Sequence, residues 1–177
     1  MRKVILGLAV SLDGFIEGPN GEYDWCFTDQ DYGLSEFFKR IDTAFIGRKS
    51  HEVLLANKDA EPDWMPKVKE YVFSNTVVGL DEGITVISGD FESAVKGIKN
   101  QEGKDIWLFG GAALTTSLMN VGLVDELWLS IHPILLGAGK PLFQNINGRV
   151  QLELLESKTY DTGLVSVKYA LKPKAEK

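Results

Sequence analysis

The segment that decides the fold is Asp105-Ile106-Trp107-Leu108-Phe109-Gly110-Gly111-Ala112-Ala113-Leu114. Its bulky apolar residues predict a buried strand, two glycines end that strand, and a helix-forming segment follows directly. A helix that starts behind a Gly-Gly turn offers free backbone N–H groups and the positive end of its dipole, which together suit a pyrophosphate. The same two glycines are also typical of a plain strand-to-helix connection. The remainder of the chain therefore has to separate these interpretations.

Strand and helix patterns alternate along the first two thirds of the chain, and strands follow one another at the end. We expect helices at 31–40 and 91–100, where apolar residues recur at helical spacing. We also expect a helix that starts after a strand at 48–55, and a helix at 112–120 that follows the Gly-Gly turn. We expect strands at 4–10, 43–46, 70–74, 84–87, 106–109, 126–134, 152–157 and 165–171. This order predicts an α/β fold with a central, mostly parallel sheet, helices on its faces and antiparallel C-terminal strands.

Three further segments are expected to lack regular structure. Residues 11–25 form a long loop rich in glycine and polar residues, and long loops in compact domains are usually functional. Residues 57–66 are polar and bounded by proline, which indicates a surface segment. The charged residues 172–177 predict a frayed tail. We therefore expect a single domain over residues 1–171.

Composition excludes several classes of protein. The chain has 177 residues, a net charge of −6 and a pI of about 5.0, which argues against a nucleic-acid binder. Its one cysteine, Cys26, permits neither an internal disulfide nor a cysteine metal cluster, and two histidines, His51 and His132, are too scattered to predict a zinc site. We expect no metal. The apolar run that starts at Val4 is too short for a membrane span and lacks a clean cleavage site, so we expect a cytoplasmic protein.

Polar segments follow three of the expected strands: residues 47–50, residues 74–76 and the pair Gly110-Gly111. Ligands of open α/β sheets bind beyond the carboxyl ends of the strands, where such segments meet. Arg48 and Lys49, at a helix start, could hold the extra phosphate of a 2′-phosphorylated nucleotide, although a solvated helix start is the alternative. Ser74-Asn75 could equally be an ordinary turn.

The chain resembles the dihydrofolate reductase superfamily, and within it the reductase domain of bacterial riboflavin biosynthesis. The resemblance extends from Val4 to about Leu171. It rests on the order and spacing of five motifs: Ala9-Val10-Ser11-Leu12-Asp13-Gly14-Phe15-Ile16, Ile46-Gly47-Arg48-Lys49-Ser50-His51-Glu52, Val72-Phe73-Ser74-Asn75, Leu108-Phe109-Gly110-Gly111-Ala112 and Val124-Asp125-Glu126-Leu127-Trp128-Leu129-Ser130. The motif Ser11-Leu12-Asp13-Gly14 and residues 133–143 are similar to the riboflavin-type branch rather than to folate reductases.

The resemblance implies a three-layer fold and a reductase that uses NADPH. It implies that Gly47, Arg48, Lys49 and Ser50 hold the adenosine-side phosphates, and that Ser74 and Asn75 meet the adenine ribose and its 2′-phosphate. It assigns the pyrophosphate to Gly110, Gly111 and Ala112 with Leu114 beside them, and the nicotinamide to Ala9 and Ile16. The cofactor would carry the hydride-transfer chemistry.

The sequence gives less information about the residues that bind the substrate. Asp13 could contact a polar ring or ribityl chain, or form a turn with Gly14. Trp25 could close over a ligand or simply pack in the core, and Ser130 falls where the family places a small hydroxyl. Asp31 stands where folate reductases have a pterin-binding carboxylate, but it is also an expected helix N-cap. We expect a structural role for His132 and name no catalytic residue.

Three functions stay open at this point. The first is a reductase resembling 5-amino-6-(5-phosphoribosylamino)uracil reductase, acting on a small heterocyclic or carbonyl substrate. The others are a dihydrofolate reductase-like activity on a pterin, and a non-catalytic NADPH-binding sensor or interaction module. The zinc deaminase that accompanies the riboflavin enzyme is absent from this sequence. We also expect a homodimer. The resemblance implies pairing through sheet edges or C-terminal strands, and apolar residues gather around a glycine-rich segment, although they could instead fold back over their own sheet: Leu135, Leu136, Leu142 and Phe143.

Overall fold

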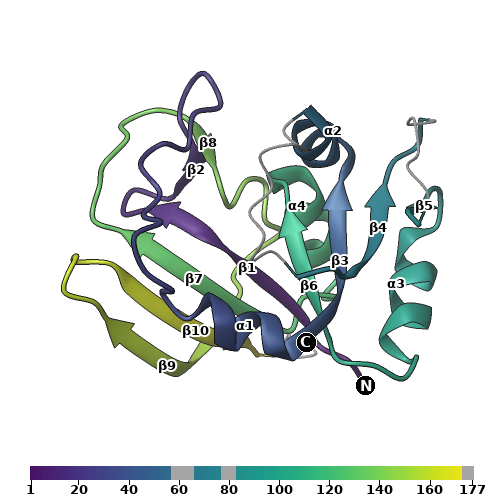
Figure 1. The fold of residues 1–177 in the computed structure, drawn as a ribbon. Coiled ribbons are helices and arrows are strands. Elements are labelled where there is room, and N and C mark those ends of the chain that lie inside the picture. Colours follow the sequence, from purple (N-terminus) through teal and green to yellow (C-terminus); the bar gives the residue numbers. More distant parts are fainter. Residues whose placement is uncertain (57–65, 77–82, 173–177) are drawn as a thin grey trace.

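The structure, a computed structural model, describes residues 1–56, 66–76 and 83–172. The strands of its main sheet are β1 Val4–Ser11, β3 Ile41–Gly47, β4 Lys69–Phe73, β5 Thr85–Ile87, β6 Asp105–Gly110, β7 Glu126–His132, β9 Leu152–Thr159 and β10 Val165–Leu171. They lie in the order β5-β4-β3-β6-β1-β7-β10-β9 (Figure 1). The strands from β5 to β7 are parallel, whereas β10 is antiparallel to both of its neighbours.

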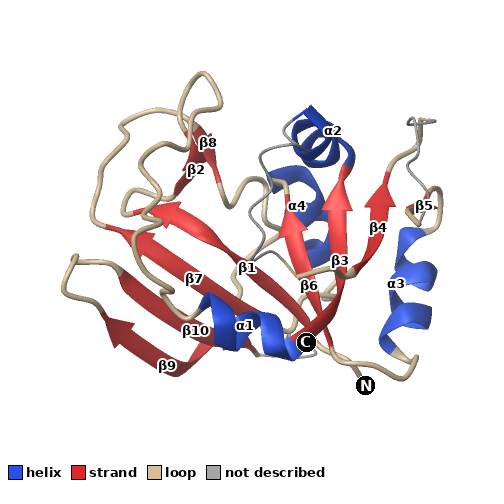
Figure 2. Ribbon diagram, in the orientation of Figure 1, coloured by secondary structure: helices blue, strands red, loops and turns tan. Residues whose placement is uncertain are grey.

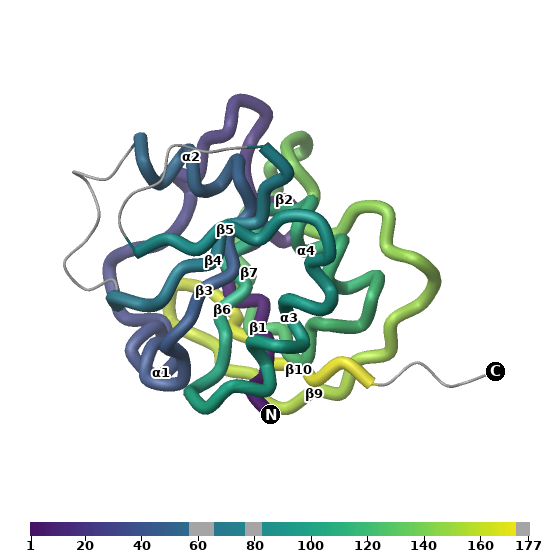
Figure 3. Tube along the Cα trace, turned by 90° about the vertical axis from the view of Figure 1, so that its right-hand side faces the viewer, coloured from purple at the N-terminus to yellow at the C-terminus, as the bar shows by residue number. Residues whose placement is uncertain are grey.

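Helices cover both faces of this sheet, as Figure 2 shows in blue against the red strands. The helices are α1 Leu34–Arg40, α2 Arg48–Ala56, α3 Phe91–Lys99 and α4 Ala112–Asn120. In the view along the sheet, α1 and α2 lie on one side of the strands and α3 and α4 lie on the other (Figure 3). The α/β fold that we predicted, with a mostly parallel sheet and an antiparallel C-terminal pair, is confirmed.

Alternation along the central strands builds two separate cores. Val4 and Leu6 of β1 pack with α3 and α4, while Ile5 between them packs with α1 on the opposite face. The same alternation in β6 places Ile106 in the core beside α3 and α4, and Trp107 in the core beside α1. Successive strand residues point to opposite faces, so a strand buried on both sides has to be apolar throughout. This explains why both strands appear as continuous apolar runs in the sequence.

Local geometry shifts some boundaries from those we predicted. The helix expected from residue 31 begins only at Leu34, because Tyr32 and Gly33 take positive φ angles of 47° and 87° that end the preceding loop. The long loop after β1 contains a short strand, β2 Phe15–Glu17, that pairs with β8 Lys140–Pro141. Strands of two or three residues carry too little alternation to be detected in a sequence.

The C-terminal edge of the sheet is open to solvent. All eight residues of β9 are exposed, and three leucines on it, Leu152, Leu154 and Leu155, are 40%, 55% and 50% exposed. The apolar residues of segment 135–143 differ in their exposure to solvent. Leu135 and Phe143 are exposed, but Leu142 is only 1% exposed and belongs to the core beneath it. Exposed apolar side chains therefore occur both on β9 and on the glycine-rich segment.

Some predictions fall where the structure describes little. The polar segment expected at 57–66 lies outside the described residues except for its last position, and so does the tail beyond Lys172. Within the described ranges, every helix is too short or too polar to cross a membrane. The same ranges bring together no group of three or more His, Cys, Asp or Glu side chains that could hold a metal ion.

Candidate functional site

A cleft of about 550 Å³ lies beyond the carboxyl ends of β3, β4 and β6. It lies where we predicted that the three polar segments would meet. The side chains and backbone that line it include most of the predicted cofactor residues: Gly47, Arg48, Lys49, Ser50, Ser74, Asn75, Gly111, Ala112 and Leu114. Gly110, the last residue of β6, is buried directly behind this lining. The fold thus brings predicted cofactor residues that are up to 67 positions apart in the sequence (47 to 114) into one wall.

Glycine lets the ends of β3 and β6 approach each other closely. A Cβ atom at Gly47 would lie 3.3 Å from both the carbonyl oxygen of Gly110 and the backbone nitrogen of Gly111. A Cβ atom at Gly111 would lie 3.0 Å from Oγ of Ser50 and would fill part of the cleft. A larger residue at Gly47 or Gly111 would therefore narrow the space where backbone N–H groups could meet a phosphate.

The N-terminus of α4 opens into this cleft. Gly111 precedes the helix, and among the described residues no side chain caps its first turn. The first N–H groups of a helix have no partner within the helix, so an uncapped start attracts anions. The cleft therefore has the shape and the donors that a pyrophosphate requires, and the residues present fit a dinucleotide.

Arg48 supplies positive charge at the edge of the cleft, but it is already engaged. Its Nη1 atom lies 2.6 Å from Oε1 of Glu52, one turn along α2. Both side chains are close to half exposed, and exposed ion pairs of this kind contribute little to stability. A guanidinium has five N–H donors, so Arg48 can keep Glu52 and still bind a phosphate. Lys140 also lines the cleft, although the sequence analysis did not single it out, and it pairs with Glu17 at 3.2 Å.

Ser74 and Asn75 line the cleft with side chains that shape the backbone. The Oγ of Ser74 donates to the carbonyl oxygen of Thr76 at 2.7 Å, and the Oδ1 of Asn75 accepts from the backbone nitrogen of Gly89 at 3.2 Å. These contacts are the turn chemistry that was the alternative to nucleotide binding. A ligand at this end would meet the amide NH₂ of Asn75, because the hydroxyl of Thr76 is already paired with Oγ of Ser74 at 3.2 Å.

A second pocket, of about 380 Å³, lies between α1 and the sheet, beside β1, β6 and β7. Ala9 and Ser130, neighbours in the β1–β7 pairing, both line it. Most of the wall is aromatic, and the rings come from the loop after β2, from α1 and from the two flanking strands: Tyr23, Phe27, Tyr32, Phe37, Phe38, Trp107, Phe109 and Trp128. We call this site the aromatic pocket. Sequence analysis missed it because these residues, taken singly, appear to be ordinary core.

His132 holds the loop that closes the aromatic pocket. Its Nε2 accepts from the backbone nitrogen of Phe27 at 3.0 Å, so the proton resides on Nδ1, which faces the carbonyl oxygen of Ser130 at 3.0 Å. Burial lowers the pKa of His132 and favours this neutral form. Trp25 packs edge-on against the imidazole at 5.3 Å and is not part of the pocket lining. The structural role expected for His132 agrees with these contacts.

Two carboxylates that we predicted for the substrate site, Asp13 and Asp31, line neither pocket. Asp13 accepts from the hydroxyl of Ser11 and from the backbone nitrogens of Leu136 and Gly137, and these hydrogen bonds, Ser11 first, lower its pKa. It therefore ties the loop after β1 to the glycine-rich segment.

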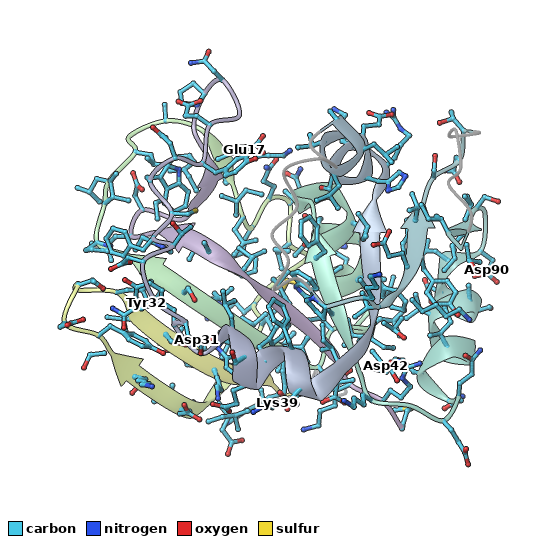
Figure 4. All side chains as sticks on the ribbon, viewed as in Figure 1. Glu17, Asp31, Tyr32, Lys39, Asp42 and Asp90 are labelled. Carbon is cyan, nitrogen blue, oxygen red and sulfur yellow. The ribbon has the colours of Figure 1, made fainter. Side chains whose placement is uncertain are left out.

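Asp31 accepts from the side chain and backbone of Ser35, which lower its pKa, and from the backbone nitrogen of Gly33. It stands with Tyr32 at the start of α1 (Figure 4) and lines neither pocket. These contacts stabilise the start of α1, but the N-cap residue is Gly33 and not Asp31 as the alternative had it. Ile16, expected near the nicotinamide, is half-buried against the larger core and lines neither pocket.

Cys26 lines the aromatic pocket as a neutral thiol. Burial, with a smaller contribution from the charge of Asp24, raises its pKa to about 11. A thiol is nucleophilic as the thiolate, so this residue is unreactive near neutral pH. Its side chain acts there as a small apolar surface.

Comparison with known proteins identifies the family. The model of the RibD C-terminal domain matches residues 2–166, and the chain belongs to this family. The uncharacterized protein YyaP of Bacillus subtilis (strain 168) is 44% identical over 177 residues, which cover 95% of this chain and 94% of YyaP.

Two solved structures support the fold. The putative riboflavin biosynthesis protein from Shewanella sp. PV-4 is similar with a TM-score of 0.83, at 23% identity over 97% of this chain and 100% of that one. The dihydrofolate reductase from Enterococcus faecalis, solved with NADP(H) and RAB-propyl, has a TM-score of 0.68 at 17% identity, over 97% of each chain. Both likenesses establish the dihydrofolate reductase-like fold, and the resemblance predicted from the five motifs is confirmed.

Proposed function

We propose that this protein is an NADPH-dependent reductase that holds the cofactor's phosphates in the strand-end cleft and its substrate in the aromatic pocket. The observation that carries the proposal is the cleft itself, in which an uncapped helix start, close-packed glycines and a cation surround one space. Membership of the RibD C-terminal domain family and the NADP(H) complex of the Enterococcus faecalis reductase support the same cofactor. By its resemblance to the riboflavin-pathway reductase, the protein would act on a small heterocyclic or carbonyl compound.

Each wall of the cleft would serve one part of the cofactor. Gly111 and Ala112 would present backbone N–H groups to the pyrophosphate, with Gly110 behind them, Leu114 packed beside them and Ser50 across the cleft. Gly47, Arg48 and Lys49 would hold the adenosine-side phosphates, and Ser74 and Asn75 would border the ribose. Ala9, in the wall of the aromatic pocket, would leave room for the nicotinamide.

The bound nicotinamide would supply a hydride, while the chain supplies binding, orientation and a dry site. The aromatic pocket suits the last task, since its wall is built of rings and apolar side chains. Ser130, on β7 directly beside Ala9, offers a hydroxyl that can donate to or accept from a substrate atom.

Arg48 gives the sharpest test of the cofactor's identity. Hydrogen bonds to charged groups contribute about 1.5–3 kcal/mol, so Arg48→Ala should weaken NADPH binding roughly tenfold or more and leave NADH nearly unchanged. Titration calorimetry measures both. Lys96→Ala is a matched control, because Lys96 forms the same i,i+4 pair with Glu92 on α3 and does not line the cleft. Equal losses for NADPH and NADH would remove the 2′-phosphate role, and absence of NADPH binding would reject the proposal.

One observation favours a second candidate, a protein that binds NADPH without turning over a substrate. In the described lining of the aromatic pocket there is no carboxyl group, and both ring nitrogens of His132 are engaged. NADPH oxidation measured against pterins, aminopyrimidine ribosides, quinones and small carbonyls separates the candidates. Turnover of any class supports the reductase, and tight binding with no turnover supports the second candidate.

A further inference from the structure

The aromatic pocket differs in charge from a site for either substrate class that the resemblance implies. Its described lining contains no Lys, Arg, Asp or Glu. A phosphorylated riboside would bring a phosphate with no cation to meet it, and a pterin would bring a polar N–H edge with no carboxylate. Burying such groups without partners costs several kcal/mol.

Two charged residues close to the wall, Lys168 and Asp31, already have partners. Lys168 lies over the ring of Trp128, 3.6 Å from its centroid, but its Nζ is 2.9 Å from carboxylate oxygens of both Glu36 and Glu156. Asp31, at the start of α1, is held by Ser35. Neither residue lines the pocket, so neither is positioned to pair with a charged substrate.

The polar atoms that do line the pocket are neutral and mostly engaged. The hydroxyl of Tyr32 donates to Asp29 at 2.7 Å, and His132 is fixed by Phe27 and Ser130. The Cys26 side chain is an uncharged thiol. The hydroxyls of Tyr23 and Ser130 remain in the described wall. The Tyr23 side chain is 57% exposed, whereas Ser130 is half-buried and its hydroxyl suits a single acceptor or donor on a ligand.

We propose that the aromatic pocket binds an uncharged, planar aromatic compound with one polar acceptor, and excludes phosphorylated pyrimidine ribosides and pterins. Rings in this wall already meet one another in edge-on contacts, such as Phe37 with Trp107 at 5.6 Å and with Trp128 at 5.3 Å, and a planar ligand extends that arrangement. A volume of 380 Å³ is within the range of sites for small molecules. The statement that this ligand is the substrate rests on the proposed function. The statement that the pocket binds it is independent of the proposed function.

A pair of probes that differ mainly in charge tests this directly. Calorimetric titration with 2-acetylnaphthalene, a neutral ketone, should give a dissociation constant at least tenfold lower than titration with naphthalene-2-carboxylate. Uridine 5′-phosphate and folate represent the two excluded classes and should bind more weakly still. Equal binding of the ketone and the carboxylate, or tight binding of either excluded class, would overturn the inference.

Variants then place the ligand in this pocket. Phe27→Ala removes a ring at the rim and should weaken binding of the ketone about five- to tenfold. Phe143→Ala is the matched control, because the two side chains are 37% and 43% exposed and Phe143 does not line the pocket. Equal effects of the two variants would remove the site from this pocket.

Leu34→Arg provides the reciprocal test. Leu34 is the first residue of α1, is 38% exposed and lines the pocket, so the variant adds a cation at the rim without cutting into the core. It should reverse the preference and favour the carboxylate over the ketone. An unchanged preference would show that charge does not select the ligand.

Failure of this inference is distinguishable from failure of the proposed function. Arg48→Ala should leave binding of the ketone unchanged, because Arg48 lines the strand-end cleft and not this pocket. A protein that binds NADPH but binds the carboxylate as well as the ketone contradicts only the inference. A protein that binds the ketone selectively but not NADPH contradicts only the proposed function.

Discussion

Replacement of Gly7 by alanine should destabilise the protein through one contact on β1. A Cβ atom at this position would lie 2.6 Å from Cζ of Phe37, about 1 Å closer than carbon atoms normally pack. The ring cannot easily retreat, since Phe37 is only 4% exposed and stands edge-on against both Trp107 and Trp128. Overpacking of this kind costs about 1–3 kcal/mol.

Urea unfolding of wild type and Gly7→Ala measures this cost. For a domain of this size, 1–3 kcal/mol corresponds to a fall in Tm of roughly 2–12 °C. Gly97→Ala is the matched control. Gly97 lies in α3, a Cβ there would have no described neighbour within 4 Å, and alanine should stabilise the helix by about 0.5–1 kcal/mol. The two substitutions should therefore shift stability in opposite directions.

A double mutant isolates the contact with the ring. In a Phe37→Leu background the side chain that meets the new Cβ is smaller, so Gly7→Ala should cost clearly less than in wild type. If Gly7→Ala is as stable as wild type, or if its cost is the same in both backgrounds, the close approach of α1 to β1 does not govern stability at this position.

Two further predictions concern surface contacts. The folded protein lowers the pKa of Asp13, so the stabilisation by this carboxylate is present above the pKa of the unfolded carboxyl and is lost as the pH falls through the folded value. In urea unfolding, Asp13→Asn should therefore be less stable than wild type at pH 7, and the difference in free energy of unfolding should narrow below about pH 4. A difference that does not depend on pH would contradict this prediction. We also predict a homodimer that pairs through the edge strand β9. Light scattering should show that the wild type is a dimer, that Leu154→Lys dissociates it and that Leu135→Lys does not. A monomeric wild type at micromolar concentration would refute this assembly.

The nature and order of the main elements could be predicted because they depend on local pattern. Continuous apolar runs marked β1 and β6, and helical spacing marked α3, at nearly the observed bounds. The Gly-Gly turn marked the helix start that opens into the cleft. Residues 47–50 and 74–75 could be assigned to one site because parallel strands end at the same edge of a sheet.

The partners of polar side chains could not be predicted in this way. Asp13 and Asp31 have the right chemistry to bind a substrate, but their carboxylates are satisfied by backbone N–H groups of nearby turns. Trp25 was a reasonable candidate for a closing ring, and it instead packs on His132. The sequence shows which groups can form hydrogen bonds, whereas the fold determines which donors lie within hydrogen-bond distance of each acceptor.

By itself, the sequence determined the α/β fold and the glycine-rich strand ends, since periodicity and turn chemistry act over a few neighbouring residues. The resemblance to the family came from the order and spacing of five motifs. Only the tertiary structure decided the character of the second site. Rings from the loop before α1, from α1 itself and from β6 and β7 come together there although they span residues 23–128. Several of these rings, such as Phe37, Trp107 and Trp128, are as buried as core residues, so no local signal distinguishes a residue that lines a pocket from one that fills the core.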